Sequence, residues 1–184
     1  MKGVVFSELL DWIERDHGVE VLDEVLLAAD LPHGGAYTSA GWYDAEELAA
    51  IVASLARWTG AGEATLLQAY GRHLFGVLAR AYPDLVARHA NALDLLTAIE
   101  SVVHAEVRKL HPDADLPRFG IVRDGPRVVL EYSSPRPFAD LARGLIDGCL
   151  AHFGECAEIA AEGTGSRCRF EIHQLAEAPC HATR

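Results

Sequence analysis

The sequence of 184 residues is poor in basic residues and has no long apolar run. Lys and Arg total 16 against 27 Asp and Glu, so the formal net charge is −11. A chain this acidic is badly suited to the phosphates of nucleic acids or to an anionic membrane surface. No apolar run approaches the ~20 residues that a transmembrane helix needs. We therefore expect no nucleic-acid partner and no membrane span.

Signals for secretion and for disulfide scaffolding are also missing. Residues 1–18 contain acidic side chains from position 8 and lack the apolar block and cleavage site of a signal peptide. This favours a cytoplasmic location. The cysteines are few and lie near the C-terminal end, so free thiols are the default expectation for all four of them: Cys149, Cys156, Cys168 and Cys180.

The first part of the chain, about residues 1–111, has the periodicity of helices. Apolar residues recur there at helical spacing, and glycines and prolines separate the runs. The last of these runs predicts one long helix over about residues 92–110, which Asn91 would cap. Up to this point the sequence predicts a helical subdomain.

The pattern changes over about residues 112–176. Asp124-Gly125 and residues 162–165 are turn signals between short strand candidates, and each predicts a hairpin. A helix over about residues 138–152, with Pro137 in its first turn, would separate the two hairpins. The fold class is therefore α+β in one domain spanning residues 1–184, with a frayed tail over 177–184.

His104 is the first candidate for chemistry. On the predicted helix it lies beside Ile99, Val103 and Val107, so an imidazole occupies an apolar face. One interpretation is a partly buried histidine that bonds to a backbone carbonyl, and position alone favours it. The other is an axial metal ligand, because neutral imidazole in an apolar pocket is what haem iron accepts.

Tyr132, Ser134 and Arg136 form the second candidate. In an extended chain, side chains at i, i+2 and i+4 project to one side, which would align two hydroxyls and a guanidinium. Three donors with one fixed positive charge suit a pair of carboxylates or phosphates. The alternative is a strand end that carries an ordinary surface arginine.

Together these signals resemble the haem-nitric oxide/oxygen binding (H-NOX) family along nearly the whole chain. The Tyr-x-Ser-x-Arg signature of that family is matched in full by Tyr132, Ser134 and Arg136. The stretch that follows the family's proximal histidine is similar to the stretch that begins at His104. Further similar segments lie at residues 1–10, 31–38, 43–44 and 144–148. The resemblance implies an α+β fold with haem between the helical region and the sheet region.

The resemblance also assigns roles to these residues. The cofactor would be a non-covalent haem b, which agrees with the lack of a Cys-x-x-Cys-His motif. His104 would ligate the iron, and Tyr132, Ser134 and Arg136 would hold the propionates. Pro117 resembles a proline that presses on the haem. The alternative is a proline that ends a loop before a strand, which would give the same sequence pattern.

The opposite side of the haem would be lined by three apolar i, i+4 pairs: Val5 and Leu9, Leu74 and Leu78, and Leu141 and Leu145. Such pairs are also typical of ordinary core. Some family members that bind O₂ stably carry a tyrosine donor on the helix after the signature, and counting from Arg136 places that position at Leu141. The resemblance therefore implies binding of NO and CO without a stable O₂ complex, unless Tyr70 or His73 supplies a donor.

The implied function is gas sensing rather than catalysis. In the family, NO weakens the bond between iron and the histidine, here His104, and the two halves of the domain then shift. Gly71 would be either a pivot or a close-packing position. The expected partner is a separate signalling enzyme, either a histidine kinase or a cyclic-di-GMP enzyme. Zinc is not expected, because Cys168 resembles one zinc ligand of some relatives but the other positions do not match.

Three alternatives stay open at this point. A haem enzyme such as a peroxidase would need a distal acid–base pair, and the implied pocket offers none. An O₂-binding haem protein would need the missing donor. A helical interaction protein without a cofactor would use His104 and Arg136 only structurally.

Overall fold

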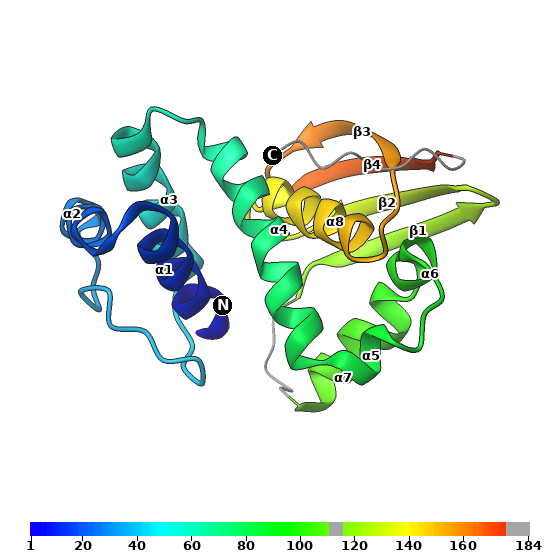
Figure 1. Ribbon diagram of the computed structural model, residues 1–184, viewed down its shortest axis with the longest axis horizontal. Coiled ribbons are helices and arrows are strands. Elements are labelled where there is room, and N and C mark those ends of the chain that lie inside the picture. The colour runs from blue at the N-terminus through cyan, green and yellow to red at the C-terminus, as the bar shows by residue number, and fades with distance from the viewer. Residues whose placement is uncertain (111–115, 176–184) are drawn as a thin grey trace. The chain divides into compact units, whose positions relative to one another are not determined.

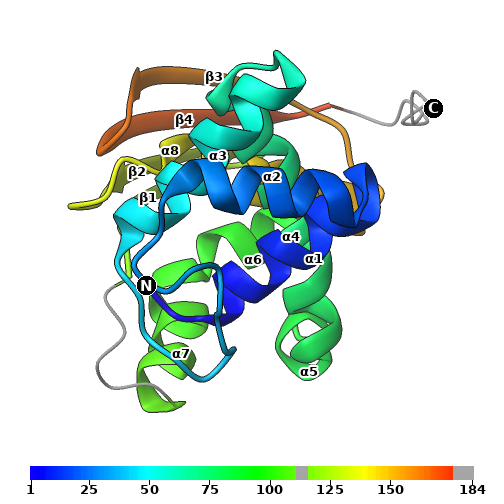
Figure 2. The ribbon, with the colours of Figure 1, turned by 90° about the vertical axis from the view of Figure 1, so that its left-hand side faces the viewer.

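Three amphipathic helices form most of the segment Met1–Tyr70, which is one of two compact units in the chain. They are α1 (Val4–His17), α2 (Val19–Ala29) and α3 (Ala45–Thr59), and α2 contacts both of the others (Figure 2). The structure is a computed structural model that describes residues 1–110 and 116–175. The apolar stripes of the helices face one another, and the large fully buried side chains of this unit are Phe6, Leu9, Ile13, Val25, Leu48, Ile51, Leu55 and Tyr70.

The helix α4 (Glu63–Ala81) runs from the first unit into the second, since the boundary falls between Tyr70 and Gly71. The second unit, Gly71–Arg184, thus begins well before the change of pattern near residue 111. It combines the end of α4 and several short helices with all the strands. Those helices are α5 (Pro83–Val86), α6 (Ala92–Thr97), the π-helix η1 (Ile99–Val103) and α7 (His104–Leu110).

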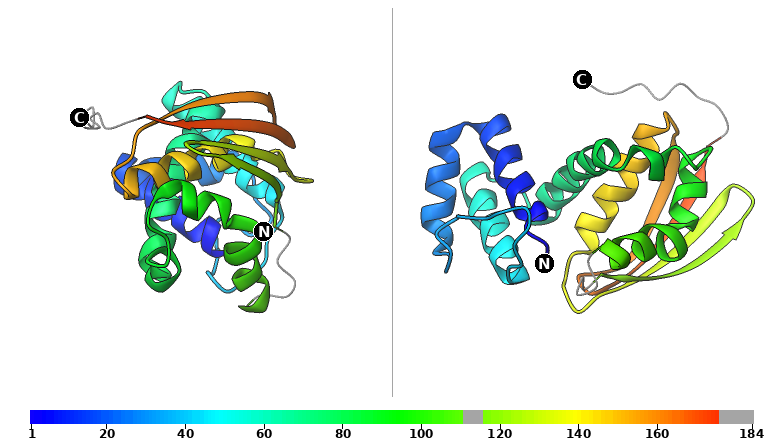
Figure 3. Two further views of the ribbon diagram at one scale, coloured as in Figure 1. Left: turned by 90° about the vertical axis from the view of Figure 1, so that its right-hand side faces the viewer. Right: turned by 90° about the horizontal axis from the view of Figure 1, so that it is seen from below.

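A four-stranded antiparallel sheet is the centre of the second unit (Figure 1). Its strands are β1 (Arg118–Asp124), β2 (Arg127–Ser133), β3 (Ala157–Thr164) and β4 (Arg167–Gln174), in the spatial order β1-β2-β4-β3. The helices α6 and α8 (Ala139–His152) lie on one face of this sheet (Figure 3). The buried core between them contains Leu93, Leu130, Ile146, Phe170 and Ile172. The expected α+β class, with two hairpins and an intervening helix, is confirmed.

Two local expectations are wrong in detail. The second hairpin has no four-residue loop, because Gly163 pairs with Cys168 and the strands continue to Thr164 and Arg167. A glycine with φ +94° can therefore lie inside a ladder as well as in a turn. The helix after the first hairpin begins at Ala139 with Phe138 at its cap, so Pro137 lies before the first turn.

The expected long helix over residues 92–110 is not a single α-helix. Asn91 caps its start as predicted, since its side chain accepts a hydrogen bond of 2.8 Å from the Asp94 N–H. After α6, however, the backbone changes to the π-helix η1, in which the N–H of His104 bonds to the carbonyl of Ile99. A π turn holds one residue more than an α turn, and it therefore rotates His104 relative to the face of α6.

In the part of the chain that the structure describes, no helix is both long enough and apolar enough to cross a bilayer.

Candidate functional site

His104 is the first residue of α7, and its imidazole is held by a carboxylate from the preceding turn. The side chain is 12% exposed, and its Nδ1 lies 3.1 Å from Oε1 of Glu100. Because Nδ1 donates its proton to this oxygen, the lone pair of the ring is on Nε2. Burial lowers the pKa of His104, and the attraction of Glu100 only partly opposes this effect. The neutral imidazole that a metal ion requires is therefore favoured.

Glu100 is the functional residue that the sequence analysis missed. Its Oε1 also accepts a hydrogen bond of 2.9 Å from the backbone N–H of Phe119, on β1, and its Oε2 lies 3.4 Å from Nη2 of Arg108. Burial alone would raise the pKa of Glu100, but the hydrogen bonds from Phe119 and His104 outweigh it and lower that pKa. The i, i+4 spacing between Glu100 and His104 could be recognised in the sequence, whereas the contact of Glu100 with β1 could not.

Tyr132, Ser134 and Arg136 lie together at the end of β2, but not on an extended strand as expected. The strand ends at Ser133, and the chain then bends. The Arg136 N–H donates to Oγ of Ser134 over 3.1 Å, and the hydroxyl of Tyr132 lies 3.4 Å from the Arg136 carbonyl. Ser134 prefers this local bond because a serine Oγ readily accepts from the N–H two residues on. The side chain of Ser134 also forms a hydrogen bond with the side chain of Tyr132.

The ring of Phe119 connects the two candidate groups. Its centroid is 5.9 Å from that of His104 and 5.5 Å from that of Tyr132. Phe119 and Tyr132 are also register partners in the β1–β2 hairpin. His104 and Tyr132 lie 28 residues apart in the sequence, yet the rings of both lie against Phe119. We call these three residues, together with Ser134 and Arg136, the wall around Phe119. This wall offers a metal-binding nitrogen, hydroxyl groups and a guanidinium. Such donors suit a group that carries both a metal ion and carboxylates.

The residues expected on the other side of the cofactor are divided between the two units. In the second unit, Leu74 and Leu141 are buried, while Leu78, Leu145 and Pro117 are partly buried. In the first unit, Leu9 is fully buried and Val5 partly so. Their apolar character agrees with the expectation, and their role as pocket lining stays a prediction.

The two polar side chains that could have supplied a donor have different surroundings. Tyr70 is fully buried, and its hydroxyl donates to the carbonyl of Val5 over 2.5 Å. Burial raises the pKa of Tyr70, so its proton is firmly held in this bond. His73 is partly buried. The single proton of Tyr70 is therefore already committed to a backbone acceptor.

The cysteines differ from one another. Cys149 and Cys168 are free and buried, and burial raises the pKa of both thiols, that of Cys149 to about 12. Cys156 is disulfide-bonded, so the expectation of a free thiol is wrong there. Cys180 lies outside the described residues. Across residues 1–110 and 116–175, no three His, Cys, Asp or Glu side chains are grouped closely enough to hold a metal ion.

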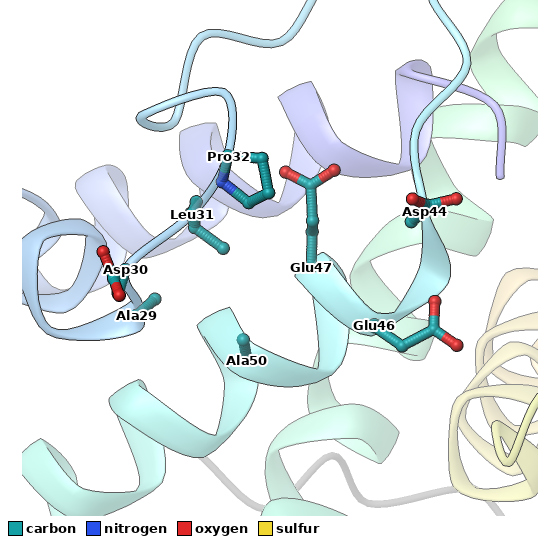
Figure 4. A pocket seen from close by; sticks show the side chains of 8 residues that line it. All are labelled: Ala29, Asp30, Leu31, Pro32, Asp44, Glu46, Glu47 and Ala50. Atoms are coloured by element: carbon teal, nitrogen blue, oxygen red, sulfur yellow. The ribbon is translucent and has the colours of Figure 1, made fainter.

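A hollow of about 370 Å³ lies in the first unit, beside the loop between α2 and α3 (Figure 4). Its lining includes Leu31, Pro32 and the buried Glu47, whose carboxylate accepts hydrogen bonds from Tyr37 (2.8 Å) and His33 (3.1 Å). None of the predicted site residues lines this hollow. The carboxylate of Glu47 therefore holds the side chains of the loop between α2 and α3.

A family model described as haem-NO-binding matches residues 2–161. The chain belongs to the H-NOX family. Its fold is also that of solved H-NOX proteins. The ferrous, unliganded protein from K. algicida has a TM-score of 0.92 and 32% identity, covering 96% of this chain and 98% of that one. The NO-ligated protein from S. oneidensis has a TM-score of 0.88 and 29% identity, covering 96% and 100%.

A third relative extends the comparison over the entire chain. The H-NOX protein from Shewanella woodyi, solved in the Fe(II)CO state, is 35% identical with a TM-score of 0.81 and covers 100% of this chain and 98% of that one. No curated protein matches the chain. The resemblance deduced from the sequence is confirmed, and with it membership of a family of haem-based gas sensors. A haem suits the wall around Phe119, since iron needs a nitrogen ligand and propionates need cationic and hydroxyl donors.

Proposed function

We propose that this H-NOX chain is a sensor of nitric oxide that holds a non-covalent haem b through His104. The observation that carries the proposal is the arrangement of His104. Its Nδ1 is bonded to Glu100, and its ring shares Phe119 with Tyr132 of the family signature. A histidine held in this way has its ring orientation and tautomer fixed for a metal. When bound, the haem would supply a ferrous iron that takes a diatomic gas.

The chain's own residues would divide the work of holding the cofactor. Arg136 carries the fixed positive charge for the propionates, while Tyr132 and Ser134 supply hydroxyl donors. Without such partners, two carboxylates would be costly to bury. Pro117 lies directly before β1, two residues before Phe119, and would press on the face of the haem. The iron would be held on one side by Nε2 of His104.

The gas selectivity would come from what the other side of the haem lacks. Leu141 is 7% exposed and has no proton to donate, and the hydroxyl of Tyr70 is occupied by the Val5 carbonyl. Bound O₂ gains negative charge and depends on a donor, whereas NO and CO depend on one far less. We therefore expect NO and CO to bind and a stable O₂ complex not to form. H-NOX proteins from S. oneidensis have been solved with each of these two ligands.

The output would be regulation of another protein rather than catalysis. We infer that the sensor acts in trans on a separate signalling enzyme, a histidine kinase or a cyclic-di-GMP enzyme, in the cytoplasm. The net charge of −11 suits a partner surface that carries basic residues. No enzymatic activity is proposed for the chain itself.

Visible spectroscopy of the purified protein tests this function. The ferrous protein is loaded with haem under argon, and spectra are recorded alone, with NO, with CO and in air. We expect distinct NO and CO complexes and no stable oxy spectrum. A lasting oxy complex would instead assign O₂ binding, and turnover with peroxide would assign an enzyme. A protein that stays colourless after haem addition would overturn the proposal.

A further inference from the structure

The carboxylate of Glu100 joins three elements of the second unit at one point. It belongs to η1, its Oε1 accepts from His104 at the start of α7, and the same oxygen accepts from the backbone of Phe119 on β1. The side chain of Glu100 is only 29% exposed. Oε1 of Glu100 therefore holds both the imidazole of His104 and the first part of β1, where Phe119 pairs with Tyr132 of β2.

This geometry differs from an ordinary helical ion pair. The Glu106–Lys109 pair on the same helix is an i, i+3 contact of 2.8 Å, with both side chains more than 40% exposed. Such surface pairs contribute little to stability or function. Glu100 instead bonds a largely buried ring and a main-chain N–H 19 residues away. Its position is set by two donors that cannot move independently of the helix and the strand.

We propose that Glu100 is a positioning residue with two effects on His104. It fixes Nε2 as the coordinating nitrogen and makes that nitrogen a stronger ligand, because a carboxylate on Nδ1–H increases the basicity of the imidazole. It also links any movement of His104 to β1, because the same oxygen holds the Phe119 N–H. This inference rests on the proposed function, in which His104 holds the haem iron.

Two substitutions at one position separate the two effects. Glu100→Gln keeps the shape of the side chain and an acceptor oxygen but removes the negative charge. Glu100→Ala removes the acceptor as well. One matched control removes a charge nearby without touching the imidazole or Glu100: Glu106→Gln neutralises the carboxylate of the exposed Glu106–Lys109 pair on α7.

The first measurement is the iron–histidine stretching frequency in the resonance Raman spectrum of the ferrous, unliganded haem protein. We expect a lower frequency in Glu100→Gln and a still lower one in Glu100→Ala, because the ligand becomes less basic. Haem transfer to an apo-globin acceptor should be about 10-fold faster in Glu100→Ala. The control Glu106→Gln should keep the wild-type frequency. A wild-type frequency in Glu100→Gln would overturn the proposed effect on ligand strength.

The second measurement is hydrogen exchange at the Phe119 amide. We expect Glu100→Gln to keep the protection of this amide and Glu100→Ala to lose it. Unchanged protection in Glu100→Ala would overturn the link to β1. If Glu100→Ala fails to fold, the Raman frequency of Glu100→Gln still decides the first effect, and in the wild-type protein a change of Phe119 exchange on NO binding decides the second.

Failure of this inference is distinguishable from failure of the proposed function. If the wild-type protein holds no haem, or holds it independently of His104, the function is wrong. If the wild-type protein holds haem through His104 and neither Glu100 variant differs from it, the function stands and the positioning role is wrong.

Discussion

The backbone carbonyl of Leu141 lies against Gly71, so that a Cβ added at Gly71 would be only 2.4 Å from the Leu141 oxygen. The same Cβ would lie 2.9 Å from the Cα of Gly144 and from the backbone nitrogen of Leu145. All three neighbours are backbone atoms of α8, which cannot rotate away as a side chain can. Gly71 is thus a position of close packing between α4 and α8.

Gly71→Ala is therefore expected to force α4 and α8 apart and to destabilise the protein by roughly 1–3 kcal/mol. Urea denaturation of the apo-protein would measure this. Gly76→Ala on the same helix is the matched control, since its Cβ would meet only the end of the Arg80 side chain, at 3.5 Å. That variant should gain roughly 0.5–1 kcal/mol from helix propensity. Equal stability of the two variants would contradict the packing role.

Leu141→Tyr tests the absence of a donor as the cause of gas selectivity. The substitution places a hydroxyl where the chain has none, and we expect a stable oxy complex in air with a slower O₂ dissociation rate. Stopped-flow spectroscopy of the ferrous protein measures both. Leu141→Phe adds the same ring without the hydroxyl and should leave the protein unable to hold O₂. An identical O₂ response of the two variants would mean that position 141 does not face the gas.

Arg136→Lys tests the hold on the propionates. Lysine keeps the charge but loses the planar fork that can bond a carboxylate with two N–H groups. The loss of one charged hydrogen bond, roughly 1.5 kcal/mol, corresponds to about 10-fold faster haem loss. Transfer of haem to an apo-globin measures this rate. A rate equal to that of the wild-type protein would place the Arg136 side chain away from the cofactor.

Glu171, on the face of the sheet opposite α6 and α8, predicts how the stability of the fold depends on pH. Arg127 donates to one carboxylate oxygen (2.5 Å) and Arg169 to the other (3.0 Å), and these bonds lower the pKa of Glu171 from 4.5 to about 2. A depressed pKa stabilises the fold above the unfolded value, and this contribution is lost as the pH falls from about 4.5 to about 2.

Glu171→Gln should therefore be less stable than the wild-type protein above pH 4.5, with a difference that shrinks on acidification and disappears near pH 2. Urea denaturation at a series of pH values, at low salt, measures the difference. Glu158→Gln, on the same face of the neighbouring strand β3, is the control. A difference between Glu171→Gln and wild type that did not depend on pH would contradict the assignment.

Much of this fold was readable from local sequence, because local physics determines it. Glycines and prolines marked the helix ends, and Asp124-Gly125 marked the first hairpin, whose Gly125 has φ +55°. The π turn before His104 was not readable, since η1 (Ile99–Val103) has a residue composition that an ordinary α-helix could also have. The length of the second hairpin was also misjudged, because pairing with β4 extends β3 through Gly163.

The candidate site could likewise be predicted from the sequence only in part. His104 and the signature triad could be named from the sequence because their types and spacing match a family pattern. Glu100 could not be assigned a role, because its second partner is the backbone N–H of Phe119, and a main-chain donor leaves no trace in residue type. The contact between Phe119 and His104 likewise depends on how β1 packs against α7.

The most direct test of the account is a haem titration of His104→Gly under argon, with and without added imidazole. The account predicts that the wild-type ferrous protein shows a Soret band, that His104→Gly does not retain haem through gel filtration, and that imidazole restores retention by filling the place of the deleted ring. If His104→Gly kept the wild-type Soret band without imidazole, the central claim that this histidine holds the iron would be contradicted.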